Sequence, residues 1–90
     1  MDMRNLNEIA ADIEREGRGK SWYAYAEPYV DAMLTLSNLT ERYYEDSAES
    51  VVSYCLANLT YWRGDLARQC KAELKEHLAQ YRASQKVVNA

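Results

Sequence analysis

The chain has 90 residues, of which 48% are hydrophobic and 28% charged, and its net charge is −3. This length provides one hydrophobic core and excludes two independent domains, while the composition excludes an extensively disordered chain. No apolar run approaches the roughly 20 residues that cross a bilayer, and the first residues lack a signal-peptide pattern. We therefore expect a cytoplasmic protein without a membrane partner.

The first predicted helix lies within residues 3–17. Apolar residues recur there at the spacing i, i+3, i+4, i+7 of an amphipathic helix: Leu6, Ile9, Ala10 and Ile13. Gly17 is the predicted end, because glycine readily adopts the left-handed conformation that closes many helices. The residues up to Lys20 are predicted to form an exposed loop.

The second predicted helix runs from about Pro28 to Leu39, because proline suits the first turn of a helix and disrupts its interior. Its predicted inner face consists of Val30, Met33, Leu34 and Ser37. Residues 22–27 are either a short helical lead-in or an irregular, aromatic-rich connector. Residues 41–47 are too polar and bulky for a core element and are predicted to form a loop.

The third predicted helix begins at about Ser47, since Asp46 and Glu49 have capping-box spacing. Its apolar stripe consists of Ala48, Val51, Val52, Cys55, Leu59 and Trp62. Gly64 permits a turn, after which Asp65 is predicted to cap a fourth helix. The apolar face of that helix consists of Leu66, Cys70, Leu74, Leu78 and Tyr81, with Ala67 and His77 at the edges. Residues 84–90 are predicted to be a frayed tail.

These elements predict an all-α fold: a compact bundle of about four short helices forming a single domain over residues 1–90. Helices three and four should form an antiparallel hairpin. Cys55 and Cys70 would then lie at similar heights on facing stripes, so a disulfide is conceivable, although two buried thiols are favoured.

Tyrosine dominates the aromatic residues, with 8 Tyr, 2 Trp and no Phe. Tyrosine and tryptophan are enriched at binding hot spots because their rings bury large area at low entropic cost. The predicted protein-interface residues are Trp22, Tyr23, Tyr25, Tyr29, Tyr43 and Tyr44. The alternative, of equal weight, is an aromatic lid packed over the bundle with its hydroxyls in water.

The charges are unevenly divided along the chain. Residues 1–61 carry 5 basic and 11 acidic side chains, a balance of −6, whereas residues 62–90 carry 6 basic and 3 acidic, a balance of +3. Such a split is compatible with a homodimer. The fourth helix has a basic stripe, which contacts phosphates or an acidic protein in one interpretation: Arg68, Lys71, Lys75 and Arg82. In the favoured alternative, it is solvated or docks beside Glu41, Glu45 and Glu49 of the same chain.

The sequence offers no catalytic, cofactor or metal site. His77 is the single histidine, and its pattern favours a packing or ion-pair role over that of a general base. Two cysteines and one histidine cannot complete a four-ligand zinc site without carboxylates or a second chain. We therefore do not expect an enzyme.

Three ordered segments over residues 22–78 resemble a group of short proteins that recur in phage and prophage genomes. The matching stretches are Pro28-Tyr29-Val30-Asp31-Ala32-Met33, Tyr43-Tyr44-Glu45-Asp46-Ser47-Ala48, and Trp62-Arg63-Gly64 with Ala67-Arg68 and Lys71-Ala72-Glu73-Leu74. The resemblance implies a phage accessory protein in the host bacterial cytoplasm and carries no activity or site residues with it.

Together, these features lead us to expect a non-catalytic protein-interaction module that binds a host or phage protein, for example as an inhibitor of a host factor. The alternative is a small helical nucleic-acid-binding protein that uses the basic stripe.

Overall fold

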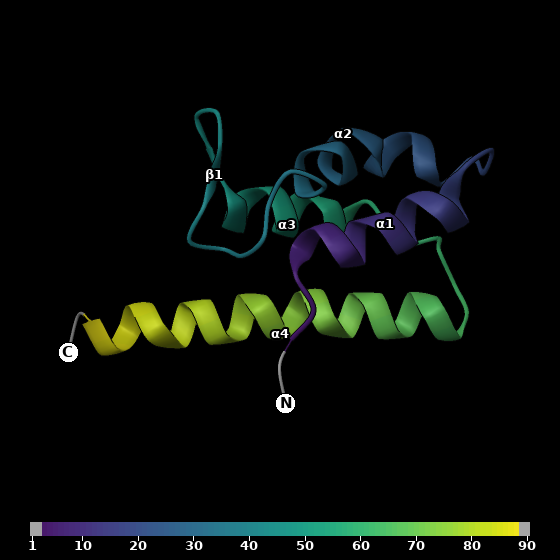
Figure 1. Cartoon of the computed structure of the whole chain (residues 1–90). Helices are drawn as coiled ribbons and strands as arrows, with labels where there is room; N and C mark the ends of the chain where they lie inside the picture. The colour runs from purple at the N-terminus through teal and green to yellow at the C-terminus, as the bar shows by residue number, and fades with distance from the viewer. Residues whose placement is uncertain (1–2, 89–90) are drawn as a thin grey trace.

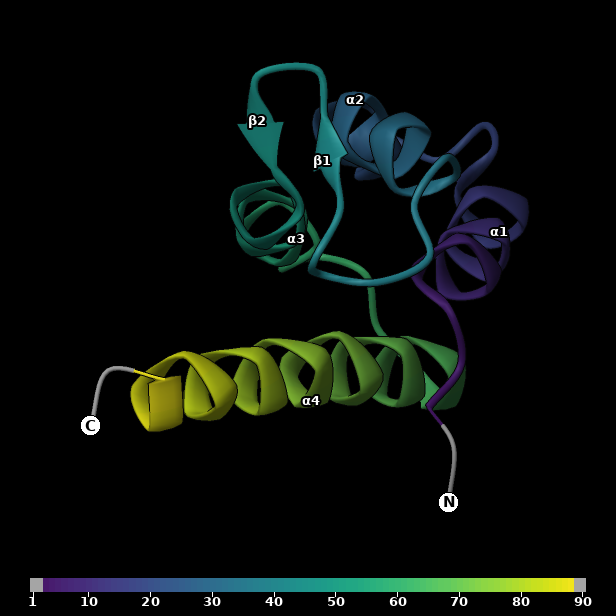
Figure 2. The same ribbon diagram turned by 60° about the vertical axis from the view of Figure 1, so that its left-hand side comes forward.

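The computed structural model describes residues 3–88, which form four helices and one small hairpin (Figure 1). The elements in chain order are α1 (Leu6–Gly17), α2 (Tyr23–Met33), β1 (Arg42–Tyr43), β2 (Asp46–Ser47), α3 (Ala48–Ala57) and α4 (Asp65–Val88). The predicted all-α bundle of about four helices is confirmed. The chain reverses between α3 and α4, as the predicted hairpin requires (Figure 1), although α3 is seen nearly end-on above α4 in Figure 2, so the two helices cross.

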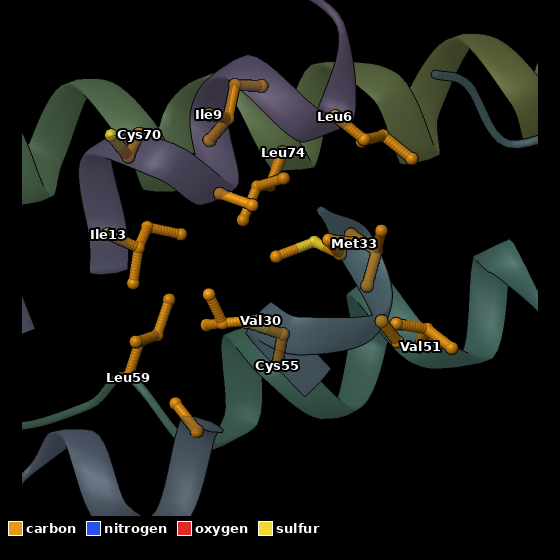
Figure 3. Packing of buried hydrophobic residues seen from close by; sticks show 14 of the residues in the cluster. Leu6, Ile9, Ile13, Val30, Met33, Val51, Cys55, Leu59, Cys70 and Leu74 are labelled. Carbon is orange, nitrogen blue, oxygen red and sulfur yellow. The ribbon is translucent and has the colours of Figure 1, made fainter. Parts of the chain in front are cut away.

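The first three helices surround the core, and α4 lies across one side of them (Figure 2). Helix α2 packs against both α1 and α3, while α4 packs against α1 and α3. Aliphatic side chains from all four helices meet in the centre (Figure 3). Helix α2 therefore lies on the far side of the molecule from α4.

Helix α1 buries the predicted face completely, since Leu6, Ile9, Ala10 and Ile13 have no exposed area. Gly17 ends this helix as predicted, but for another reason. Its φ lies outside the left-handed region, which only Gly19 and Gly64 occupy among the glycines. A Cβ at position 17 would lie 2.4 Å from Cδ1 of Tyr23, so glycine is required by the close approach of that ring.

The predicted bounds of the second helix, Pro28 and Leu39, are both wrong, whereas the alternative of a helical lead-in over residues 22–27 is confirmed from Tyr23 onward. Helix α2 begins at Tyr23, five residues before Pro28, and ends at Met33 rather than Leu39. Proline at this interior position removes one backbone hydrogen bond. Tyr23 and Ala26 are both buried in the first turns, which favours the helix despite this loss. Val30 and Met33 are buried as predicted, whereas Leu34 and Ser37 lie beyond the helix and are only partly buried.

Residues 41–47 form a hairpin where a loop was predicted. Arg42 pairs with Ser47 and Tyr43 with Asp46, and the two-residue turn places Tyr44 at φ 55°. A positive φ is typical of such tight hairpin turns. Asp46 therefore belongs to a strand and does not cap α3.

Helix α3 is capped by Ser47, whose hydroxyl oxygen accepts a hydrogen bond from the Ser50 amide at 3.1 Å. The helix begins one residue after the predicted start and ends at Ala57. Leu59 and Trp62 are buried as the apolar stripe predicts, but they lie in the connection to α4.

Gly64 provides the predicted turn into α4, with φ 116°. Asp65 is the first residue of the helix instead of its cap, and its carboxylate pairs with Arg68. Ala67 and His77 are buried rather than at the edges. Residues 84–88, predicted as part of a frayed tail, continue the helix, and residues 89–90 lie outside the described part.

Cys55 and Cys70 are free, buried thiols, as the favoured prediction stated. They lie on opposite sides of the core, on α3 and α4 respectively (Figure 3). Burial raises the pKa of Cys55 to about 12 and that of Cys70 to about 11. Both thiols are therefore protonated near neutral pH.

Candidate protein interface

Large aromatic side chains are exposed on α2, the hairpin, α3 and the connection from α3 to α4. The exposed fraction is 70% for Tyr25, 86% for Tyr44, 58% for Tyr54 and 79% for Tyr61. Exposure of large apolar rings to water is unfavourable. A monomeric protein seldom gathers several of them on its surface unless that surface binds something. We call the following set the aromatic face: Trp22, Tyr25, Tyr29, Tyr43, Tyr44, Tyr54 and Tyr61.

Two pockets lie within the aromatic face. The first, of about 260 Å³, is here called the Trp22 pocket and is lined by Trp22, Tyr25, Ala57, Asn58, Thr60 and Tyr61. Trp22 stacks on Trp62 with ring centroids 5.1 Å apart and planes 19° from parallel. Because Trp62 is itself buried, this stack holds one wall of the pocket against the core.

The second pocket, of about 340 Å³, is here called the Tyr54 pocket. It is lined by Pro28, Tyr29, Ala32, Tyr43, Asp46, Ser50, Val51 and Tyr54. Tyr29 and Tyr54 stack across α2 and α3, with centroids 5.8 Å apart and planes 25° from parallel. The ring of Tyr43 in turn packs edge-on against Tyr44, at 4.7 Å. Tyr25 and Tyr29 are one turn apart on α2, so they connect the two pockets.

The predicted interface residues are thus brought together, with one exception. Tyr23 is only 7% exposed and lies beneath the aromatic face, edge-on to Trp22. Its hydroxyl has no hydrogen-bond partner in the described part of the chain, and burial raises its pKa to about 12. The Tyr23 ring packs into the core, as the alternative of an aromatic lid predicts, but its hydroxyl is buried and not in water as that alternative predicts.

Tyr54 and Tyr61 were missed by the sequence analysis. The apolar stripe of α3 indicates which side of that helix faces inward, and Tyr54 lies off the stripe that contains Val51 and Cys55. A large aromatic residue on the outward side of a helix is the signal that could have identified it. Tyr61, in the connection to α4, has no comparable periodic signal.

The aromatic face belongs to an acidic segment. Residues 21–62 contain six acidic side chains and only Arg42 as a basic one, a balance of −5. The acidic residues are Glu27, Asp31, Glu41, Glu45, Asp46 and Glu49. Neither pocket is lined by lysine or arginine. The residues of the face therefore come from an acidic part of the chain, although Arg82 and Lys71 of α4 contact this part at Glu49 and Trp62.

Two of the four side chains of the basic stripe pair with carboxylates of the same chain, and a third hydrogen-bonds a backbone carbonyl. Arg68 pairs with Asp65, and Lys71 Nζ donates a hydrogen bond to the Trp62 carbonyl at 2.7 Å. Burial, together with nearby Arg63 and Lys75, lowers the pKa of Lys71.

At the other end of the stripe, Arg82 Nε donates to Glu49 Oε2 at 2.8 Å, as the docking alternative predicts for one of its three acidic residues. Arg82 also donates to Ser53 Oγ at 3.3 Å. Lys75 alone among the four has no ion pair or side-chain hydrogen bond within residues 3–85.

A charged cluster around Arg4 joins the N-terminal segment to α1 and α4. Its guanidinium makes a two-point contact with Glu73, at 2.6 and 3.1 Å, and binds Asp12 at 2.7 Å. The hydrogen bond from Arg4 is the main reason that the pKa of Asp12 is lowered. His77 is 6% exposed, and its Nε2 donates to the Arg4 carbonyl at 2.7 Å. His77 therefore has the structural role that its helix position predicts.

Among the described residues, no group of three or more histidine, cysteine, aspartate or glutamate side chains is arranged to hold a metal ion. None of the described helices combines the length and apolar character needed to cross a membrane. Comparisons of the chain with protein-family models, curated proteins and solved structures find no match. The function is therefore argued from the chain's own residues.

Proposed function

We propose that this protein is a non-catalytic interaction module that binds a partner protein through its aromatic face. The observation that carries the proposal is the convergence of exposed tyrosines from three separate segments around two pockets. Tyrosine presents an apolar ring and a polar hydroxyl together, which suits a surface that is wet when free and dry when bound.

The rings are partly ordered before any partner arrives. Trp22 is held by its stack on Trp62, and Tyr29 and Tyr54 support each other. Side chains that are already restricted lose less conformational entropy on binding, so more of the contact energy contributes to affinity. This pre-organisation supports binding as the use of the face.

The biological setting is proposed from the resemblance to phage-encoded proteins. A partner in the host bacterial cytoplasm, from the host or the phage, fits an accessory protein of this size, and inhibition of a host factor is one such role. The basic stripe offers less support for nucleic-acid binding, because Arg68, Lys71 and Arg82 already have partners within the chain.

Capture from a bacterial lysate with the immobilised full chain tests the proposal. The binding variant is Tyr25→Ser/Tyr61→Ser, which removes two exposed rings from the Trp22 pocket. The matched control is Arg68→Ser/Lys75→Ser, which removes two exposed side chains of the basic stripe. We expect a specific protein that the wild type and the control retain and the binding variant loses. Circular dichroism checks that all three are folded.

Two outcomes would contradict this proposal. Loss of capture in the control alone would assign binding to the basic stripe, and equal capture by all three would make the aromatic face structural. Light scattering of the wild type at low and high salt identifies a homodimer, which would make a second copy the partner of the face.

A further inference from the structure

We propose that the Tyr54 pocket binds an arginine side chain of the partner protein. This inference rests on the proposed function and names the chemistry of the contact. The pocket gathers the rings of Tyr29, Tyr43 and Tyr54 with the carboxylate of Asp46. Aromatic faces attract cations through their quadrupole, and several rings around one carboxylate make a site for an organic cation.

The carboxylate of Asp46 has no counter-charge of its own. It makes no ion pair or side-chain hydrogen bond within residues 3–85, although Arg42 lies on the neighbouring strand of the hairpin. Arg42 instead donates to the carbonyl of Glu45, and Arg82 pairs with Glu49. The Asp46 carboxylate is therefore free to accept hydrogen bonds, while Arg42, bound to the neutral carbonyl of the adjacent residue, keeps its own positive charge nearby.

The Trp22 pocket provides an internal comparison. It is also aromatic, but its lining contains no charged residue. A hydrophobic side chain of a partner would therefore fit that pocket as well as a charged one. Of the two pockets, only the Tyr54 pocket has a carboxylate in its lining, and we expect only that pocket to select for charge.

Arginine matches this pocket better than lysine does. Its guanidinium is planar, so it can stack on a tyrosine ring while donating two parallel hydrogen bonds to a carboxylate. Lysine is a compact, strongly hydrated charge that offers no planar stacking surface. The balance of −5 over residues 21–62 also attracts a basic partner and opposes an acidic one.

Titration of the full-length, isotope-labelled protein with N-acetyl-arginine amide, followed by amide NMR shifts, tests the proposal. The isosteric neutral probe is N-acetyl-citrulline amide. We expect the arginine probe to shift the amides of Asp46, Ser50 and Tyr54 with millimolar affinity, since one side chain contributes only a small part of an interface. The citrulline probe should leave them unmoved.

Variants distinguish the contribution of the Asp46 charge to binding from that of the tyrosine rings. Asp46→Asn should weaken the arginine probe about fivefold, the range expected for a partly exposed ion pair. Asp31→Asn is the matched control, because Asp31 is an exposed carboxylate of α2 outside the pocket lining, and it should have no effect. Tyr54→Leu should abolish binding, whereas Tyr54→Phe keeps the ring and should retain it.

The inference is overturned if citrulline binds as well as arginine, if Asp31→Asn weakens binding as much as Asp46→Asn, or if tetramethylammonium binds more tightly than the arginine probe. Failure here leaves the proposed function intact when Tyr25→Ser/Tyr61→Ser still loses the captured protein. The converse result is that the arginine probe binds while Tyr25→Ser/Tyr61→Ser still captures the same protein. That result would support this inference and show that the aromatic face as a whole is not the interface.

Discussion

We expect Gly17→Ala to destabilise the protein, although alanine is the better helix former. Gly17 is the last residue of α1 and has helical backbone angles, so alanine would ordinarily stabilise this position by about 1 kcal/mol. The added Cβ, however, would lie 2.4 and 2.6 Å from two ring atoms of Tyr23 and 3.0 Å from the indole of Trp22.

The magnitude follows from how little these rings can move. Tyr23 is 7% exposed and Trp22 is fixed by its stack on Trp62, so relief requires a shift of buried groups. Overpacking of this kind costs about 1–3 kcal/mol, which exceeds the gain in helix propensity. We expect a net loss of up to about 2 kcal/mol, or a melting temperature lower by up to roughly 15 °C in a domain of this size.

Thermal unfolding followed by circular dichroism and by tryptophan fluorescence measures both parts of this effect. A displaced Trp22 should change the native fluorescence spectrum as well as the midpoint. Gly19→Ala is the control: its Cβ would meet no atom within 4 Å, but its φ of 79° makes alanine costly. We expect the control to lose stability without a change in fluorescence. A Gly17→Ala protein that is more stable than wild type, with an unchanged spectrum, would refute the reasoning.

Three further predictions concern buried groups. Tyr23→Phe should raise stability by about 1 kcal/mol in urea unfolding, because it removes a buried hydroxyl that has no partner. The lowered pKa of Asp12 means that its ion pair stabilises the protein above the ordinary value of 3.8 and that this contribution is lost as pH falls through the lower folded-state pKa. Asp12→Asn should therefore cost about 1 kcal/mol at pH 7, and the cost should decrease as the pH falls below 3.8; a cost that does not change with pH would contradict the ion pair. Cys55 and Cys70 should react with a thiol reagent at pH 8 only as fast as the protein opens, with guanidinium-unfolded protein as the control.

The sequence predicts those features that depend on local periodicity. The apolar spacing of α1 identified Leu6, Ile9 and Ile13 because a helix presents such residues to one side wherever it packs. The bounds of α2 could not be obtained in this way, since the start at Tyr23 depends on burial against Gly17 from another helix. Local rules about proline therefore gave the wrong start.

Pairings between distant residues were also beyond sequence analysis. Arg4 and Glu73 are 69 positions apart, and only the docking of α4 across α1 brings them together. The same docking gives Arg82 its partner on α3, which is why the basic stripe looked uncompensated when helix α4 was considered alone. Charge patterns on one helix indicate a binding surface only after the neighbouring helices are placed.

The absence of phenylalanine has a physical explanation in this arrangement. Apart from Tyr23 and Trp62, the core is built from aliphatic and sulfur-containing side chains, and seven of the eight tyrosines lie wholly or partly at the surface. A phenylalanine at those seven positions would expose apolar area without a polar group and favour nonspecific association. Tyr23 is the exception, since its ring is buried and its hydroxyl unpartnered. If the tyrosine hydroxyls keep an aromatic surface soluble, Tyr23 is the one position where phenylalanine should raise the stability of the protein. Tyr25→Phe/Tyr61→Phe should instead leave stability unchanged and lower solubility.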